Sequence, residues 1–472
     1  MTLIASISGI RGTIGGQAGS NLTPPDIVKF TAAYAEWLKK SRNKKRPLVV
    51  IGRDARLSGP MLFQLVSGTL TGMGAEVVNL GLASTPTTEI MVTHLKADGG
   101  LILTASHNPL QWNALKMLNH HGEFLNDKEG RAILDIAAQT NMNFAAVEEL
   151  GSIKEFSQAD DVHIKAILKC PLVNLPAIRK ANFKVVVDGV NSVGGVVVPK
   201  LLKALGVKQI VQLNCTPDGR FPHPPEPLPE NLTALASEVK KKKAHVGFAV
   251  DPDVDRLAII NEDGTMFGEE YTLVAVADYV LKKKRGNTVS NLSSTRALKD
   301  ITLLYGGKYA ASAVGEVNVV EMMKATKAVI GGEGNGGVIL PSIHYGRDAL
   351  VGIALFLSLL ATSKMKCSQL RASYPSYSIS KNKIHLAPDM DVENILQQIR
   401  EKYKHYPVTT VDGLRIDFEE QKEWVHLRKS NTEPILRVYA ESPTMKAAEK
   451  LAEKIINDIR ELSHQQTSLP EA

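Results

Sequence analysis

A serine, a histidine and a lysine lie close together in one short part of the sequence, and these side chains are well suited to chemistry. The apolar run 100–104 predicts a short buried strand, and Pro109 ends the segment because proline lacks a backbone N–H. Ser106 and His107 therefore lie in the loop after a strand, where open α/β sheets usually bind their ligands. Lys116 follows ten residues after Ser106. Together the three side chains predict group transfer through a hydroxyl, but they do not identify the group.

Three aspartates at alternate positions form a second group of polar residues. Asp251, Asp253 and Asp255 directly follow the apolar run 246–250, which predicts a buried strand. Carboxylates so closely spaced repel one another unless a cation lies between them, and Mg²⁺ prefers oxygen ligands with positions left open for phosphate. A surface acidic turn is the plain structural alternative. A calcium EF-hand is excluded because Arg256 occupies the sixth loop position, where the sharp turn needs glycine.

Further polar segments have compositions suited to binding small polar ligands. Glu333 and Asn335 lie in the glycine-rich run 331–337 and can hydrogen-bond hydroxyls, although a flexible turn explains the run equally well. Arg11 is flanked by glycines, and an ordinary turn is again an equal alternative. The segment 428–434 predicts either an anion-binding loop or a polar hairpin turn, because guanidinium and small polar groups fit phosphate. Its candidate residues are Arg428, Ser430, Asn431 and Thr432.

Composition and charge restrict the class of protein. The chain has 472 residues, of which 44% are hydrophobic and 22% charged, values typical of a soluble globular protein with several domains. The net charge of +7 suits an anionic partner, but no aromatic residues interleave with the lysine runs, so we expect no nucleic acid. The apolar run 349–361 is too short to span a membrane. The N-terminus lacks a secretory signal and the three cysteines form no CxxC pair, so we expect a cytoplasmic protein.

Alternating strand and helix patterns run through most of the chain. Apolar runs of strand length alternate with helical stretches in three cycles, which predicts three doubly wound α/β domains of similar topology with largely parallel sheets. The remaining C-terminal part combines four strand segments with two helices, the pattern of a smaller α+β domain. The expected domains are 1–150, 151–256, 257–372 and 373–472.

In their order and spacing, these motifs resemble those of the α-D-phosphohexomutase family. The resemblance covers nearly the whole chain, and its most specific parts are the serine loop and the Asp-x-Asp-x-Asp-Arg loop. The segments that carry it are 8–12, 52–54, 104–109 with Lys116, 251–256, 331–337 and 428–434. The resemblance implies four domains around one central cleft, with one of these loops contributed by each domain.

The resemblance also implies a reaction and a role for each candidate residue. Hexose 6-phosphate and hexose 1-phosphate would interconvert through a hexose 1,6-bisphosphate, with Ser106 carrying the phosphoryl group. That phosphoserine would bind Mg²⁺ together with Asp251, Asp253 and Asp255, and Lys116 would act as general acid or base. The residues assisting near the reacting phosphate would be Arg11, His107 and Arg256. Those binding the sugar hydroxyls would be Glu333 and Asn335, and those binding the other phosphate Arg428, Ser430, Asn431 and Thr432.

Two departures from the family's pattern bear on the substrate. Pro252 and Val254 lie between the metal aspartates, where many members have glycine, and they stiffen that loop. Asn335 and Gly337 replace the serine and the histidine that many bacterial members have in the sugar loop. This loop looks more like those of archaeal-type phosphoglucosamine mutases, which favours glucosamine phosphate over glucose or mannose phosphate.

Alternatives of other classes are a magnesium-dependent sugar phosphatase and a non-catalytic protein that binds sugar phosphates. The phosphatase would release inorganic phosphate, whereas a mutase would release almost none. The binding protein would carry no phosphate on Ser106. The oligomeric state stays open between a monomer and a homodimer.

Overall fold

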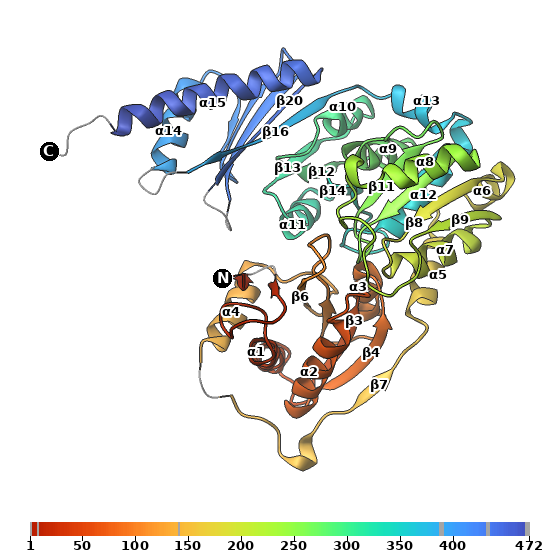
Figure 1. Cartoon of the computed structure of the whole chain (residues 1–472), viewed down its shortest axis with the longest axis vertical. Helices are drawn as coiled ribbons and strands as arrows, with labels where there is room; N and C mark the ends of the chain where they lie inside the picture. Colours follow the sequence, from red (N-terminus) through yellow and green to blue (C-terminus); the bar gives the residue numbers. More distant parts are fainter. Residues whose placement is uncertain (1, 7–8, 140–141, 387–390, 431–434, 468–472) are drawn as a thin grey trace. The chain divides into compact units, whose positions relative to one another are not determined.

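The computed structural model describes residues 2–6, 9–139, 142–386, 391–430 and 435–467 (Figure 1). The chain divides into two compact units, each built from two separate stretches. Unit 1 contains Met1–Lys284 and Val329–Arg371, and unit 2 contains Arg285–Ala328 and Ala372–Ala472. The central cleft implied by the resemblance stays a prediction, as do the four expected domain boundaries.

The first sheet of unit 1 has seven strands in the order β1-β2-β6-β5-β3-β4-β7. One side is parallel and consists of β3 (Leu48–Arg53), β4 (Glu76–Leu82), β5 (Gly99–Leu103) and β7 (Ile153–Glu155). The other side is antiparallel and consists of β1 (Ile4–Ser6), β2 (Gly9–Thr13) and β6 (Trp112–Leu118). The helices of this region are α1 (Pro24–Arg42), α2 (Gly59–Gly72), α3 (Thr85–His94) and α4 (Asp127–Ala137), followed by a 3₁₀ turn at Val147–Glu149.

The antiparallel strand β6 differs from the prediction that this sheet is largely parallel. Its sequence contains Asn113 and Lys116, which interrupt any regular alternation of apolar and polar side chains. β6 pairs with β5 on one side and β2 on the other. The loop 104–111 is therefore the connection between two neighbouring antiparallel strands, and Lys116 lies on a strand rather than in a loop.

The second sheet of unit 1 has the order β11-β10-β8-β9. Its strands are β8 (Lys184–Asp188), β9 (Gln209–Leu213), β10 (Val246–Val250) and β11 (Leu257–Asn261). The helices near it in sequence are α5 (Ala159–Lys169), α6 (Leu175–Ala181), α7 (Gly194–Leu205) and α8 (Thr233–Lys242), with a 3₁₀ turn at Pro229–Asn231. β11 pairs antiparallel with β10, so this sheet extends past residue 256, where the sequence predicts a third cycle to begin.

The remaining elements of unit 1 include a short hairpin and two largely buried helices. The hairpin pairs β14 (Ile330–Glu333) with β15 (Gly337–Ile339), and the helices are α9 (Glu269–Lys283) and α12 (Ala349–Ser363). A short helix, α13, follows at Cys367–Ala372. α12 is the long apolar run of the sequence, and all but its last three residues are buried. Of the helices that the structure describes, none has the length and apolar character needed to cross a membrane.

Unit 2 combines a small α/β portion with the C-terminal sheet. The α/β portion consists of β12 (Thr288–Asn291), α10 (Ala297–Leu304), β13 (Tyr309–Ser312) and α11 (Glu316–Thr326). The C-terminal sheet is antiparallel, with the order β16-β20-β19-β18-β17. Its strands are β16 (Ser378–His385), β17 (Val408–Thr409), β18 (Leu414–Phe418), β19 (Glu423–Lys429) and β20 (Ile435–Ser442), accompanied by α14 (Val392–Lys402) and α15 (Met445–Thr467). The predicted α+β character of the C-terminal region is confirmed.

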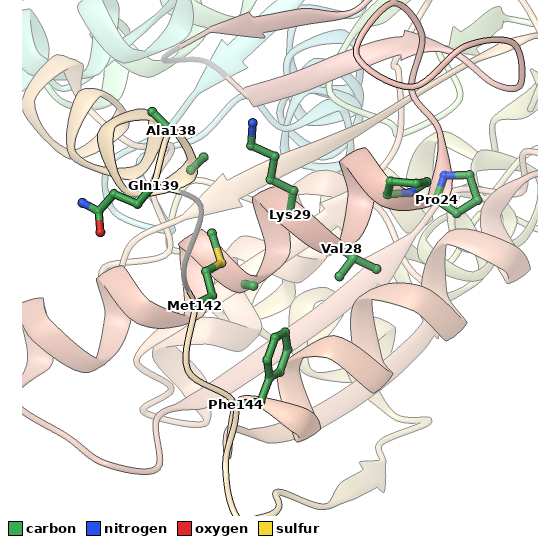
Figure 2. A pocket seen from close by; sticks show the side chains of 10 residues that line it. Pro24, Val28, Lys29, Ala138, Gln139, Met142 and Phe144 are labelled. Carbon is green, nitrogen blue, oxygen red and sulfur yellow. The ribbon is translucent and has the colours of Figure 1, made fainter.

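A cavity of about 700 Å³ lies beside α1 and the segment that follows α4 (Figure 2). Its walls are mostly apolar, with Val28, Met142 and Phe144 among the residues that line it. Its lining does not include any of the residues predicted to form the functional site.

Candidate active site

Ser106 lies in the loop after β5 and is buried, with 7% of its surface exposed. Its φ of +49° is in the left-handed region, which is uncommon for residues other than glycine. The hydroxyl donates a hydrogen bond to Oδ2 of Asp251 at 2.6 Å. The serine and the first aspartate are thus in contact, although 145 residues separate them in the sequence.

The fully buried guanidinium of Arg56 holds the serine loop in place. Its Nε lies 3.0 Å from Oδ2 of Asp54, and the hydroxyl of Thr104 donates to the same oxygen at 2.7 Å. Its two Nη groups donate to four backbone carbonyls of the loop, those of Ser106, Asn108, Pro109 and Trp112. The sequence does not single out Arg56, although it follows two residues after the Gly-Arg-Asp motif at 52–54. The conformation of the serine loop therefore depends on a buried ion pair.

His107 lies beside the serine hydroxyl, with Nδ1 at 3.4 Å from Oγ of Ser106. Burial and the nearby Arg256 cation lower the pKa of His107 to about 2, although the charge of Asp253 opposes them. Its imidazole is therefore neutral at physiological pH. It can serve as a hydrogen-bond partner at the site but not as a cation.

Asp251, Asp253 and Asp255 follow β10 and are fully buried. One carboxylate oxygen from each lies within 4.8 Å of the others. Burial and the two neighbouring carboxylates raise the pKa of Asp251 well above its usual range. Val254 has a φ of +64°, which is strongly disfavoured for a β-branched side chain and explains why glycine suits this position. The predicted acidic group is thus present, on a strained loop.

These carboxylates fit a divalent cation. Within the described part of the chain, the buried Oδ1 atoms of Asp253 and Asp255 have no hydrogen-bond partner. Asp251 differs, because its Oδ1 accepts the backbone N–H groups of Asp255 and Arg256, both at 3.1 Å. Buried carboxylate oxygens without donors are costly, and a hard cation such as Mg²⁺ would satisfy them and relieve the repulsion between them.

Lys116 lies on β6 and faces the aspartates. Its Nζ is 2.7 Å from Oδ2 of Asp253 and 3.9 Å from Oδ2 of Asp255. Burial alone would lower the pKa of Lys116, but the charges of the two carboxylates outweigh burial and raise it. The hydroxyl of Thr85, at the start of α3, also donates to Oδ2 of Asp253 at 2.7 Å. Thr85 has no signal in the sequence that would mark it as a site residue.

Arg347 connects the aspartate loop to the glycine-rich hairpin. Its Nη2 donates to Oδ2 of Asp255 at 2.6 Å, and its Nη1 donates to Oε2 of Glu333 at 2.9 Å. Glu333 is the last residue of β14. The guanidinium of Arg347 therefore pairs with both the predicted sugar-binding carboxylate and the predicted metal loop. Arg347 is not among the predicted residues, and the Gly346 before it is a weak signal by itself.

The side chain of Arg347 also explains the glycine at position 337. A Cβ built on Gly337 would lie 2.4 Å from Cδ of Arg347, far inside van der Waals contact. Asn335 lies in the turn of the hairpin, and its Oδ1 accepts the N–H of Gly337 at 3.2 Å. A histidine at position 337, as in many bacterial members of the family that the chain resembles, would require Arg347 to move.

The two predicted arginines of unit 1 are Arg256 and Arg11. Arg256 is partly buried, with Nη1 at 3.4 Å from Oε1 of Glu226 and Nε at 4.0 Å from Oδ1 of Asp255. Arg11 is half-buried on β2, opposite Ala114 of β6 in the sheet register, and burial lowers its pKa. The register places Arg11 on the strand next to the one that carries Lys116.

The predicted phosphate loop belongs to unit 2 and is described in part. Nε of Arg428 donates to Oδ1 of Asp412 at 2.8 Å. The backbone N–H of Ser430 donates to the carbonyl of Ile435 at 2.9 Å. Asn431 and Thr432 lie outside the described residues. The roles predicted for these four residues stay predictions.

Four family models match successive parts of the chain. Three describe alpha/beta/alpha domains I, II and III of phosphoglucomutase/phosphomannomutase and match residues 4–143, 161–264 and 268–377. The fourth describes the C-terminal domain and matches residues 389–458. The chain belongs to the phosphoglucomutase/phosphomannomutase family. This membership confirms the predicted family and the predicted fold class of three α/β domains and one C-terminal α+β domain.

Relatives within the phosphoglucomutase/phosphomannomutase family match over almost their whole length. A phosphoglucomutase/phosphomannomutase of Thermococcus kodakarensis is 35% identical over 94% of this chain and 96% of its own. A phosphoglucosamine/phosphogalactosamine mutase of Sulfurisphaera tokodaii is 32% identical over 96% of this chain and 97% of its own. A crystal structure of a family protein from Burkholderia thailandensis superposes with a TM-score of 0.80 at 26% identity, covering 97% of each chain.

Proposed function

We propose that this family member is a phosphohexomutase that interconverts hexose 6-phosphate and hexose 1-phosphate, with Ser106 carrying the phosphoryl group. The observation that carries the proposal is the 2.6 Å hydrogen bond from Ser106 to Asp251, inside a group of three buried aspartates. A hydroxyl in this position suits phosphorylation, because a cation held by the aspartates would neutralise the charge of the phosphate.

Different residues of the chain contribute to different parts of the phosphoryl transfer. The bond between Oγ of Ser106 and phosphorus breaks while a bond forms from a sugar oxygen to the same phosphorus, so one ester replaces another. The sugar hydroxyl loses a proton and the departing Oγ of Ser106 gains one, so that the serine hydroxyl is restored. We assign Lys116 as the group that moves this proton, because Mg²⁺ bound to Asp253 and Asp255 would neutralise the carboxylates that raise the pKa of Lys116 and so allow the amine to accept it. Mg²⁺ bound by Asp251, Asp253 and Asp255 would supply charge neutralisation at the phosphoryl group. Arg11 and Arg256 add positive charge, and His107 offers a neutral hydrogen-bond partner.

The product of this step is a hexose 1,6-bisphosphate, which must turn around before the other phosphate returns to Ser106. Glu333 and Asn335 are assigned to the sugar hydroxyls, which lie between the two phosphates in either orientation. The phosphate that is not reacting is assigned to Arg428, Ser430, Asn431 and Thr432. A site that binds either phosphate equally well suits a reaction that runs in both directions.

Glucosamine phosphate is the substrate we favour, with glucose and mannose phosphates as the alternative. Support comes from the loop around Asn335 and Gly337, which lacks the serine and the histidine of many bacterial members. It also comes from the Sulfurisphaera tokodaii relative, a phosphoglucosamine/phosphogalactosamine mutase. The Thermococcus kodakarensis relative, a phosphoglucomutase/phosphomannomutase, keeps the alternative open. A cytoplasmic location and the choice between monomer and homodimer stay predictions of the sequence.

The test is phosphopeptide mass analysis after incubation with glucose 1,6-bisphosphate. We expect a phosphate on Ser106 in the unaltered chain and none on that peptide in Ser106→Ala, with mutase turnover lost in the variant. Rates with glucosamine, glucose and mannose 1-phosphates then rank the sugars. Unmodified Ser106 after incubation would overturn the phosphoserine mechanism. Stoichiometric release of inorganic phosphate would instead favour a sugar phosphatase.

A further inference from the structure

A second cluster of titratable side chains lies outside the predicted catalytic residues, and all of it belongs to unit 1. Its members are Glu89 on α3, His163 on α5, and His344 and Asp348 just before α12. Glu89, His163 and Asp348 are buried to within 1% of full burial, and His344 has 10% of its side chain exposed. Neither the family motifs nor the proposed reaction uses these four residues.

Asp348 is the centre of the cluster. Its Oδ1 accepts the backbone N–H groups of Leu350 and Val351, at 2.8 and 3.1 Å, and so caps α12. Its Oδ2 lies 2.8 Å from Nε2 of His163 and 3.1 Å from Nε2 of His344. Burial opposes ionisation of Asp348, but the two histidines outweigh it and lower its pKa. Both Nε2 atoms are placed to donate to this carboxylate.

His344 lies between two carboxylates. Its Nε2 faces Asp348, and its Nδ1 lies 3.1 Å from Oε2 of Glu89. The contact with Asp348 is a hydrogen bond, and the contact with Glu89 is an ion-pair distance without hydrogen-bond alignment. A ring placed between two carboxylates favours the protonated imidazolium. Burial alone would lower the pKa of His344, but the neighbouring Asp348 and Glu89 carboxylates raise it to about 10. Among the described residues, His163 also faces His344, with its ring edge-on at 6.2 Å.

Protons rather than a metal ion fit these distances. Two ligands of a tetrahedral zinc, each about 2.0–2.1 Å from the metal, lie about 3.3–3.4 Å apart. The contacts of Oδ2 of Asp348 with the two histidines, at 2.8 and 3.1 Å, are hydrogen-bond lengths. The other nitrogen of His163 has its own partner, the hydroxyl of Thr87 at 3.0 Å.

The cluster holds the segment that carries Arg347. Arg347 lies between His344 and Asp348 in sequence and pairs with Asp255 and Glu333. The backbone of this segment is also fitted closely to Glu89, since a Cβ on Gly346 would lie 1.8 Å from Oε2 of Glu89. Directly after Asp348, the N–H of Ala349 donates to the carbonyl of Val254 in the aspartate loop at 3.2 Å.

We infer that Glu89, His163, His344 and Asp348 form a buried positioning cluster, in which a protonated His344 fixes Arg347 between the aspartate loop and the glycine-rich hairpin. The inference rests on the proposed function for its effect on turnover. When His344 loses its proton, no positive charge remains on the ring that lies between the Glu89 and Asp348 carboxylates. Their repulsion then displaces the segment 344–348, and Arg347 with it.

The charge of His344 is measured directly by NMR of the full chain labelled with ¹³C,¹⁵N-histidine. The resonance is assigned among the 12 histidines by its absence in His344→Gln. We expect an imidazolium that persists above pH 8. A neutral His344 at pH 7, or one equivalent of zinc in the purified protein, would overturn the inference, whether or not any variant folds.

The effect on turnover is measured with Glu89→Gln, which keeps the shape of the side chain but removes its charge. His344 should then titrate at lower pH, and kcat/KM should fall by about tenfold per pH unit above the new pKa. A merely structural defect would lower the rate by the same factor at every pH. The matched control is His94→Gln, because His94 is exposed on the same helix α3, and its profile should follow that of the unaltered chain.

Hydrogen exchange separates this inference from the proposed function. At pH 8 we expect faster exchange of the hairpin 330–339 in Glu89→Gln than in the unaltered chain or in His94→Gln. If the unaltered chain converts no phosphosugar, the proposed function fails, while the NMR titration and the exchange rates still decide the role of the cluster. Parallel pH profiles together with unchanged exchange of the hairpin would overturn the positioning role.

Discussion

The side chain of Arg347 occupies the space that a side chain at position 337 would need. Arg347 bridges Asp255 and Glu333, so its place is fixed from both ends. Its Cδ would be only 2.4 Å from a Cβ on Gly337, and Cδ is too near the backbone of Arg347 to swing away freely. At the scale of single residues, the position of the Arg347 side chain therefore explains why residue 337 is glycine.

Gly337→Ala tests this dependence. The added methyl group should push Arg347 away from Asp255 and Glu333, and a displacement of this kind lowers kcat/KM by about 10- to 100-fold. Steady-state kinetics with the preferred phosphosugar measure the effect. The control is Gly68→Ala in α2, where a Cβ would meet nothing within 4 Å. That substitution should leave turnover unchanged and stabilise the helix by up to about 1 kcal/mol. Equal kinetics for the two variants would contradict the role given to Gly337.

Among the elements of unit 2, strand β20 carries a buried acid that makes the sheet sensitive to pH. Oε1 of Glu441 accepts the backbone N–H of Arg296 at 2.9 Å and the indole N–H of Trp424 at 2.7 Å. Burial raises the pKa of Glu441 to about 7, against the effect of these donors. The folded-state pKa is above the unfolded value, so the protonated acid stabilises the fold below about pH 4.5, and this stability is lost as pH rises through 7.

Glu441→Gln should therefore stabilise unit 2 at pH 8 and have little effect at pH 5. From the shift of the pKa, the gain at pH 8 is about 3 kcal/mol. Urea unfolding followed by pulse proteolysis, with the cleavage products of unit 2 identified by mass spectrometry, measures it. Glu420→Gln is the control, because Glu420 is exposed in the turn after β18. The same change in stability at pH 5 and at pH 8 would show that Glu441 is not the group responsible.

The sequence predicts a strand where its own composition marks it as buried. It does not predict features that depend on pairing with distant parts of the chain. β3, β5 and β10 are almost wholly apolar, so the sequence marks them as buried strands. β6 gives no such signal, because the charged Lys116 interrupts its apolar residues. On this strand, Lys116 pairs with Asp253. β11 was a recognisable strand, but its pattern does not say that it joins β10. Arg56 and Arg347 have partners 50 and 92 residues away, so a cation's neighbours in sequence cannot show what it binds.

At the scale of the whole molecule, the candidate metal site belongs to only one of the two units. Ser106, Lys116, the three aspartates and Arg347 all lie in unit 1, although unit 1 is made from two stretches of chain. Binding of a cation stabilises the folded form of the unit that contains its ligands. Mg²⁺ should thus slow hydrogen exchange in unit 1, above all in 99–118, 246–257 and 330–348. A ligand at a hundred times its Kd stabilises by about 2.7 kcal/mol, enough to slow global opening by about 100-fold.

Mass spectrometry of the full chain with and without Mg²⁺ measures this difference segment by segment. Asp253→Asn should abolish the slowing, because it removes a ligand and the charge that pairs with Lys116. Glu420→Gln should keep it, since that residue is exposed in unit 2. Unchanged exchange in 246–257 at saturating Mg²⁺ would contradict the metal assignment. Slowing that persists in Asp253→Asn would mean that the ion binds elsewhere on the chain, because the buried oxygens of the aspartate loop would then not be its ligands.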